Sequence, residues 1–283
     1  MALPADTFAA REPADTTVAD SLLPAAMLPE APAPRAAGWG VGVWVWDREA
    51  LLRFHGLSLL ELLERVPALV ITRAGGPGSP TGVAAWGVGG GRLRVFLDSW
   101  ELDPLRTVDF DLQRLALADL EAVRVERWLG ETRIHLFSFR LDAREARSRF
   151  EGGTGDLNTR LLRALFASPV GAANTVLVAG DIVDTDGARR QPFTSGTVIA
   201  RWTRQVADGT ALELEYRQNG FDRGGTFSTA ATRRDLLLRG RSQLTRSLQL
   251  DAQLGRSSED PRGVDTLLIA RSAVQGGARA LLD

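Results

Sequence analysis

Residues 201–220 read RWTRQVADGTALELEYRQNG, and this stretch decides the fold. Past the Asp-Gly pair at positions 208 and 209, apolar residues alternate with charged ones: Leu212, Leu214 and Tyr216 against Glu213, Glu215 and Arg217. A period of two is typical of a β-strand with one apolar and one polar face. Asp-Gly between two such runs predicts a hairpin, because glycine tolerates the positive φ of a tight turn. The apolar face must then meet either a second sheet or lipid.

The same pattern continues through the C-terminal half of the chain. Nine stretches are predicted to be strands: 132–141, 145–151, 157–167, 174–183, 196–206, 210–218, 233–243, 245–256 and 264–272. Within one of them, Ile199 and Arg204 break the alternation. No segment with helical spacing interrupts these strands. Consecutive alternating strands with polar connections predict an antiparallel meander.

The N-terminal half has a different composition. Residues 1–37 are rich in Ala, Pro and Asp and predict a flexible linker. Residues 57–66, LSLLELLERV, have helical spacing, with Ser58 as N-cap and Glu61 placed as in a capping box. Pro67 ends this helix. Strands are expected at 38–46, 69–73, 92–98 and 121–128, with glycine-rich loops after 73 and at 87–91 and a short helix or turn at 112–120. This order predicts a small α/β module that ends near residue 130.

Composition argues against several classes of function. The chain has 34 basic and 35 acidic residues, so nucleic acid is not an expected partner. Every basic residue is arginine, which removes Schiff-base chemistry by lysine. Without cysteine, disulfides and thiolate metal sites are impossible. No run of about 18 apolar residues predicts a transmembrane helix, and no signal peptide is visible at the N-terminus.

No arrangement of residues predicts a catalytic centre, a cofactor or a bound metal. His135 lies on an expected strand without a nearby carboxylate pair, so we interpret it as structural. A group of acidic residues offers oxygen ligands for a hard cation but lacks regular Ca²⁺-loop spacing, so we interpret it as a solvated polar loop. Its members are Asp98, Glu101, Asp103, Asp109 and Asp111. The glycines at 87, 89 and 91 precede a strand, so they are not a dinucleotide fingerprint. The chain is not expected to be an enzyme.

Three segments, in this order and spacing, resemble the plug domain of TonB-dependent outer-membrane receptors. Residues 59–72, LLELLERVPALVIT, resemble the plug helix and the strand after it, with Ala68 where the family usually has glycine. Residues 94–101, RVFLDSWE, resemble the family's VxLDGxP turn. Residues 111–127, DLQRLALADLEAVRVER, resemble its DLxxIPxxxIERVEVxR segment, with Ala116 in place of proline.

The resemblance implies an α+β plug domain over residues 38–130, followed over residues 131–283 by antiparallel β-strands of an outer-membrane β-barrel. The apolar face of the strands would then meet lipid, and the charged face would meet the lumen or the plug. The family's barrel has about twenty-two strands, and the few strands present here cannot enclose a plug. We therefore expect an incomplete barrel and a fragment of a longer receptor.

The resemblance also implies a function and its partners. Such a receptor takes up a scarce nutrient, for example a siderophore or a vitamin, and a TonB-type energising protein pulls on its N-terminal segment. Outer-membrane lipid is the other expected partner. The nutrient is expected to rest on loops of the plug, by analogy at Gly75, Gly76, Pro77, Gly78, Ser99 and Trp100.

A second interpretation stays open on the residues alone. The strands would close into the β-sandwich of a soluble or surface α+β binding protein that transports nothing. Leu212, Leu214 and Leu250 would then pack against a second sheet. The two interpretations differ in what covers the apolar face of the strands.

Overall fold

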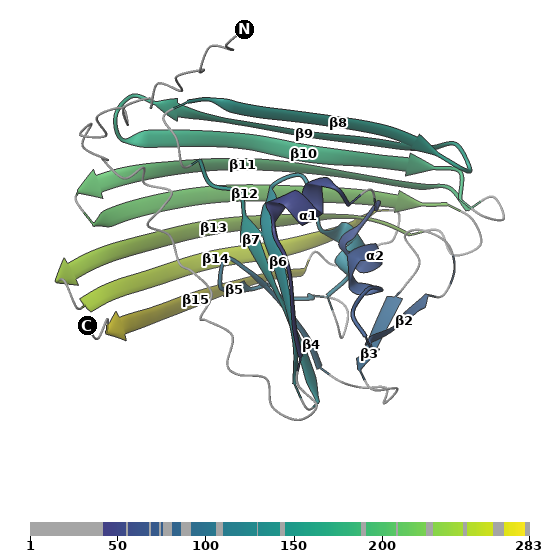
Figure 1. Cartoon of the computed structure of the whole chain (residues 1–283), viewed down its shortest axis with the longest axis horizontal. Coiled ribbons are helices and arrows are strands. Elements are labelled where there is room, and N and C mark those ends of the chain that lie inside the picture. The colour runs from purple at the N-terminus through teal and green to yellow at the C-terminus, as the bar shows by residue number, and fades with distance from the viewer. Residues whose placement is uncertain are drawn as a thin grey trace, which may run out of the picture.

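The structure is a computed structural model that describes residues 42–54, 56–67, 69–73, 75, 81–85, 92–105, 110–128, 130–141, 145–187, 191–207, 209–224, 229–245, 248–262 and 269–280. The expected linker, residues 1–37, lies outside the described residues. The described chain forms two units, which we call the N-terminal unit, residues 42–141, and the wall, residues 145–280 (Figure 1). Within the described segments, no helix combines the length and the apolar character needed to cross a bilayer.

The N-terminal unit is built on a five-stranded sheet. Its elements are β1 (Gly42–Trp46), α1 (Arg48–Leu52), α2 (Leu59–Leu63), β2 (Leu69–Arg73), β3 (Thr81–Ala85), β4 (Arg92–Leu97), β5 (Trp100–Glu101), the 3₁₀ helix η2 (Leu112–Arg114), β6 (Leu120–Trp128) and β7 (Glu131–Ser138). The strand order is β1-β6-β7-β4-β5, in which β4 and β7 run parallel and the other neighbours antiparallel. β2 and β3 pair separately. The sequence alone predicts neither α1 nor β3 nor β5.

The wall is a single eight-stranded antiparallel sheet in chain order. Its strands are β8 (Arg147–Gly155), β9 (Thr159–Val170), β10 (Asn174–Thr185), β11 (Phe193–Ala207), β12 (Thr210–Arg223), β13 (Thr229–Thr245), β14 (Leu248–Arg262) and β15 (Ile269–Ala280). Each strand pairs with the next, so β8 and β15 are the two edges. The predicted meander is confirmed, and its strands are mostly longer than the alternation suggests.

One predicted strand is present but belongs to the other sheet. The stretch expected at 132–141 as the first strand of the meander corresponds to β7, which pairs with β6 and with β4 in the first sheet. The division expected after residue 130 therefore cuts this sheet between β6 and β7. Alternation cannot separate the two cases, because any half-buried strand has a period of two whichever sheet it joins.

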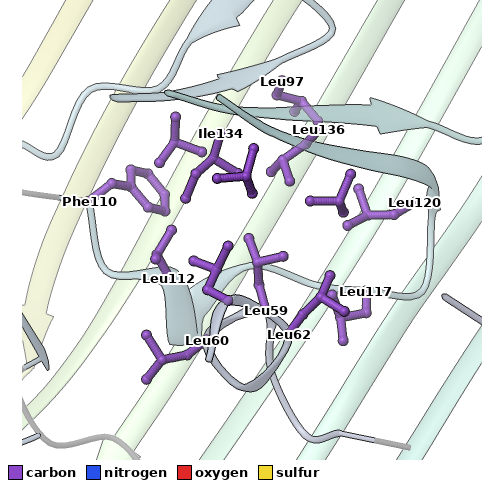
Figure 2. Close-up of a cluster of buried hydrophobic side chains, with 14 of the residues drawn as sticks. Leu59, Leu60, Leu62, Leu97, Phe110, Leu112, Leu117, Leu120, Ile134 and Leu136 are labelled. Atoms are coloured by element: carbon purple, nitrogen blue, oxygen red, sulfur yellow. The ribbon is translucent and has the colours of Figure 1, made fainter. Parts of the chain in front are cut away.

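The core of the N-terminal unit lies between α2 and the five-stranded sheet, with wall strands behind it (Figure 2). The leucines of α2 are fully buried there: Leu59, Leu60, Leu62 and Leu63. They meet apolar residues of the sheet such as Leu97, Ile134 and Leu136. Leu237 of β13 belongs to the same cluster, so the core of the N-terminal unit extends onto the wall.

The predicted helix at 57–66 is confirmed but shorter, and its capping differs. Ser58 is the N-cap of α2, yet its side chain makes no capping hydrogen bond. Glu61 accepts a hydrogen bond from the backbone N–H of Leu57, one residue before the cap, at 3.1 Å. The helix ends at Leu63, and turns lead to Pro67, because the residue before proline avoids the α conformation.

The two faces of the wall differ in chemistry. Large apolar side chains exposed on its outer face include Leu162, Phe166, Val178, Ile182, Val198, Leu214, Tyr216, Leu236, Leu238, Leu250 and Leu254. No second sheet of described residues covers them, so the sandwich in which Leu214 and Leu250 are packed is not formed. The inner face is polar and charged and lies against the N-terminal unit.

Candidate functional site

Buried charges join the N-terminal unit to the inner face of the wall. Four carboxylates and four arginines form this cluster, which we call the ion network: Asp98, Asp119, Glu213 and Glu215 with Arg140, Arg201, Arg217 and Arg239. Three members stand at strand ends of the first sheet. Asp98 follows β4 directly, Asp119 directly precedes β6, and Arg140 comes soon after β7. This end of the sheet therefore faces the wall, and the charges of the network cancel.

Asp119 lies at the centre of the contact and is fully buried. Its carboxylate accepts hydrogen bonds from Nη2 of Arg201, at 3.2 Å, and from Arg217. Arg201 also donates from Nε to Oε2 of Glu215 at 2.8 Å and from Nη1 to the backbone oxygen of Phe139 at 2.9 Å. Two neighbouring wall strands are thus tied to the start of β6.

Asp98 holds the end of β4. It accepts from the backbone N–H of Ser138 at 2.9 Å, from the Ser138 hydroxyl, and from Nη2 of Arg140 at 3.0 Å. Burial by itself raises the pKa of Asp98, but the charges of Arg140, Arg239 and Arg201 outweigh burial and hold that pKa below its usual range. Asp98 is therefore ionised. Its 3% exposure corrects the expectation of a solvated loop at this position.

The glutamates of β12 are shared among the arginines. Nη1 of Arg239 donates to Oε1 of Glu213 at 2.7 Å and to Oε2 of Glu215 at 2.9 Å, and Arg140 also bonds Glu213. Desolvation of buried charges roughly offsets their attraction, so such pairs add little net stability. Removing one partner is costly, however, because the other charge stays buried without compensation. Displacement of the N-terminal unit would leave charges of the network buried without partners, so the network strongly favours the observed contact.

An apolar contact lies beside the ion network. Phe139 and Leu141, which follow β7, cluster with Leu165, Leu177 and Ile199 of the wall. Ile199 is fully buried there. It breaks the alternation of its strand because the inner face at this point meets apolar side chains of the N-terminal unit. Arg204 breaks the pattern for another reason, since it is exposed near the end of β11.

The residues expected to face a ligand are not brought together. Gly75 is exposed between β2 and β3, and these strands lie toward the end of the wall to which β8, β10 and β12 point (Figure 1). Gly76, Pro77 and Gly78 lie outside the described residues.

The turn after β4 departs from that expectation. Ser99 is partly buried, with φ 72°. Trp100 is 3% exposed and packs over Gly255 and against Leu237 of the wall. Its side chain is therefore turned to the wall and is not presented to a ligand in this structure.

The acidic group is divided among separate partners. Glu101 and Asp103 each pair with an arginine, Asp111 caps η2, and Asp109 lies outside the described residues. In the part of the chain that the structure describes, no three His, Asp or Glu side chains are grouped as ligands for a metal ion. Asp98, the buried member of the group, serves the fold and the contact with the wall.

His135 lies in the first sheet, stacked on Phe96 with ring centroids 4.9 Å apart. It is buried, and neither ring nitrogen has a hydrogen-bond partner among the described residues. Nε2 lies 3.7 Å from Oε1 of Glu126. Burial lowers the pKa of His135 to about 4, so the ring is neutral at neutral pH. This environment fits the structural interpretation of the residue.

Cavities open where the units meet. A crevice of ≈ 40 Å³ between α2 and the wall is lined by polar groups that include Glu61, Arg73, Asp181, Ser195 and Thr197. That volume holds only a few water molecules. A wider groove of ≈ 770 Å³ follows the inner side of β8.

Sequence reasoning identifies part of the ion network. Glu213, Glu215 and Arg217 stand on the polar face of the hairpin predicted from residues 201–220, and Glu213 and Arg217 bond residues of the N-terminal unit. Asp119 and Arg140 lie just outside strands and have no periodic signal. Nothing in their local sequence indicates a buried ionic partner.

Comparison with known proteins gives a likeness of fold. Neither a protein-family model nor a curated protein sequence matches the chain. The siderophore receptor PirA from Acinetobacter baumannii is 12% identical, with a TM-score of 0.63 over 82% of this chain and 43% of the receptor. A mutant of the ferric enterobactin receptor PfeA from Pseudomonas aeruginosa is 11% identical, with a TM-score of 0.63 over 84% and 45%. P. aeruginosa FpvA bound to heterologous pyoverdines is 13% identical, with a TM-score of 0.62 over 77% and 34%.

At these identities the likeness concerns the fold alone. The chain spans less than half the length of each of these receptors. The descriptions of the PirA and PfeA structures name receptors, not enzymes. The antiparallel wall agrees with the barrel strands that the resemblance found in the sequence implies. At the level of fold, the chain resembles part of a TonB-dependent siderophore receptor.

Proposed function

We propose that this chain forms the plug and part of the β-barrel of an outer-membrane receptor that takes up a scarce nutrient with the help of a TonB-type energising protein. The two-faced wall is the observation that carries the proposal. Its outer face is apolar and uncovered among the described residues, and its inner face is charged and buried against the N-terminal unit. Alternation of lipid-facing apolar and inward polar side chains is typical of transmembrane barrels.

The limit of the apolar band runs obliquely across the wall. On the outer face, Ile182 is the last apolar residue of β10 before Asp184, and Leu254 is the last of β14 before Arg256. Strand pairing places Ile182 on the same rung as Asp260. Between β10 and β14, the limit of the apolar band therefore moves along the strand direction by the distance from Asp260 to Leu254, roughly 20 Å. Across the sheet, β10 and β14 lie roughly 19 Å apart.

That slope supports a bilayer as the covering medium. It corresponds to strands tilted by roughly 45° against the normal of a flat apolar layer. Strands of transmembrane barrels tilt by about 35–45°. Packing against a second protein sheet does not require the apolar residues to form a band at this angle.

The N-terminal unit takes the place of the plug, which we extend from the expected residues 38–130 to residue 141 so that it includes β7. The nutrient, a siderophore or a vitamin, would rest on the loop with Gly75, Gly76, Pro77 and Gly78. The strands that flank this loop, β2 and β3, lie toward the end of the wall whose connections include the longer ones, 186–192, 224–228 and 263–268 (Figure 1). The other end has the short turns 171–173, 208–209 and 246–247. Longer loops are typical of the extracellular side and short turns of the periplasmic side.

Further strands and two partners complete the proposal. β8 and β15 are unpaired edges in the described part of the chain, and unpaired edges expose backbone hydrogen-bonding groups. A barrel of about eight strands has room only for its own side chains, so additional strands are needed to enclose the N-terminal unit. Outer-membrane lipid would cover the apolar band, and the energising protein would pull on residues 1–37.

Fluorescence quenching tests the proposal on the full chain. The chain has no cysteine, so Ile182→Cys and Asp260→Cys each introduce a single labelling site. Each variant is labelled with a fluorophore and reconstituted into vesicles that contain a brominated lipid. We expect strong quenching at position 182 and weak quenching at position 260, although the two share a rung. Weak quenching at both positions, or a protein that stays soluble and folded without detergent, would contradict the proposal.

A further inference from the structure

A polar cluster stands on the outer face of the wall at the limit of the apolar band. We call it the outer-rim cluster, and it consists of Tyr216 and Gln218 of β12, Arg234 of β13 and Arg256 of β14. Strand pairing places Tyr216, Leu236 and Arg256 on one rung. Gln218 and Arg234 pair on the next rung that faces outward. The two arginines are therefore diagonal neighbours on adjacent strands, and they border the last apolar residues.

Among the described residues, the arginines of this cluster have no acidic partners. The Tyr216 hydroxyl donates to Oε1 of Gln218 at 2.7 Å, and Nε of Arg234 lies 3.4 Å from the same oxygen. Arg234 and Arg256 are both exposed, and neither forms an ion pair with a carboxylate within the described segments. On the inner face, by contrast, Arg201 bonds two carboxylates. Two adjacent guanidinium groups without a counter-charge repel each other and attract an anion.

The position of the cluster indicates where that anion comes from. The cluster lies beyond the apolar band on the side of the longer connections, which the proposed function places at the outer leaflet. A tyrosine whose ring adjoins an apolar band and whose hydroxyl adjoins polar groups is typical of a membrane interface. Anions concentrated at that depth are the charged head groups of lipids.

We propose that the outer-rim cluster binds the phosphate of an anionic lipid head group in the outer leaflet. This inference rests on the proposed function, because it requires lipid against the outer face. A guanidinium group binds phosphate through two parallel charge-assisted hydrogen bonds. Diagonal neighbours on antiparallel strands have Cα atoms about 7–8 Å apart, so the long side chains of Arg234 and Arg256 reach one phosphate together.

Binding of lipid A to the full chain in neutral detergent micelles tests the inference. The probe is lipid A with both phosphates, and native mass spectrometry measures the fraction of protein that retains it. Arg234→Gln with Arg256→Gln is expected to weaken binding at least about tenfold, because both phosphate contacts are lost. Arg204→Gln is the matched control, because Arg204 is an exposed arginine of the outer face that lies at the other end of the wall from the cluster. It should change lipid A binding by less than about twofold.

Further measurements distinguish binding of a lipid head group from binding of a free anion. They also distinguish failure of the lipid site from failure of the proposed function. Dephosphorylated lipid A should bind no better to the wild type than to the double variant, and inorganic phosphate at the same concentration should not bind measurably. Equal retention of lipid A by the double variant, or an equal loss in Arg204→Gln, overturns the inference. If the quenching at positions 182 and 260 still follows the oblique band, only the lipid site is lost; if it does not, the proposed function fails as well.

Discussion

At the scale of single residues, Asp119 matters most to the docking of the two units. It is fully buried and bonds two arginines of the wall. Replacement by asparagine keeps the shape but leaves Arg201 and Arg217 to share Glu215. Breaking a buried ion pair costs about 3–5 kcal/mol, and the remaining glutamate offsets part of that cost. We expect Asp119→Asn to lower the free energy of unfolding by about 2–4 kcal/mol, measured by urea unfolding in micelles.

An exposed ion pair provides the control for this prediction. Glu49 pairs with Arg53 on α1, and both side chains are 73% exposed. Solvent screening leaves such a pair with little effect, so Glu49→Gln should change the free energy of unfolding by less than about 0.5 kcal/mol. Equal losses in the two variants would show that burial of the ion network is not what makes Asp119 important.

His135 makes stability depend on pH. Burial lowers its pKa from 6.5 to about 4 in the folded chain. Above pH 6.5 the ring is neutral in both states and has no effect. As the pH falls from 6.5 to 4, the unfolded chain binds a proton that the folded chain excludes, so the free energy of unfolding decreases, by up to about 3 kcal/mol. Below pH 4 the ring is protonated in both states and the loss is complete.

A phenylalanine variant isolates this effect from that of the carboxylates, which also titrate on acidification. Neither ring nitrogen of His135 has a hydrogen-bond partner among the described residues, so His135→Phe should cost little at pH 7.5. Urea unfolding of both proteins between pH 7.5 and 4 should give a shallower pH slope for the variant. Parallel slopes would mean that the histidine is accessible to protons in the folded state.

At the scale of elements, the fit between β5 and β14 depends on one glycine. A Cβ atom at Gly255 would lie 2.3 Å from the Trp100 ring and 2.7 Å from Cδ2 of Leu237. Gly255→Ala therefore overpacks the contact and should destabilise the chain by about 1–3 kcal/mol, with a red shift of tryptophan emission as the indole moves toward water. At Gly240 the nearest atom, Cδ1 of Leu212, is 3.8 Å away, so Gly240→Ala should leave both measurements unchanged. A neutral Gly255→Ala variant would show that Trp100 is not confined there.

At the scale of the whole molecule, a charged side chain introduced on the outer face should lower the free energy of unfolding by different amounts in lipid and in water. Leu238 lies inside the apolar band and Leu244 at its end, and both are exposed. In a bilayer, Leu238→Arg should cost about 2–4 kcal/mol and Leu244→Arg about 0–1 kcal/mol, measured by unfolding from vesicles. In contact with water alone, both changes would stay within about 0.5 kcal/mol. Equally small losses in the two variants would contradict a lipid environment at the outer face.

The sequence by itself determined the strands of the wall and which of their faces is apolar. Side chains of a strand point alternately to opposite faces, so the order Leu212, Glu213, Leu214, Glu215 separates the two faces without reference to any other part of the chain. The α2 helix is local in the same sense, because spacing and Pro67 define it. These features depend on residues next to one another, and sequence reasoning identifies them correctly apart from their ends.

Tertiary structure alone decided which surfaces meet. β7 alternates like a wall strand but joins β4 and β6, Trp100 turns to a glycine on β14, and Asp119 pairs with Arg217, 98 positions away. Each outcome depends on the free energy of bringing distant surfaces together, including the desolvation of charges that are costly to bury unless a partner is in place. This free energy cannot be predicted from residues next to one another in the sequence, because the contacts that determine it exist only in the folded chain.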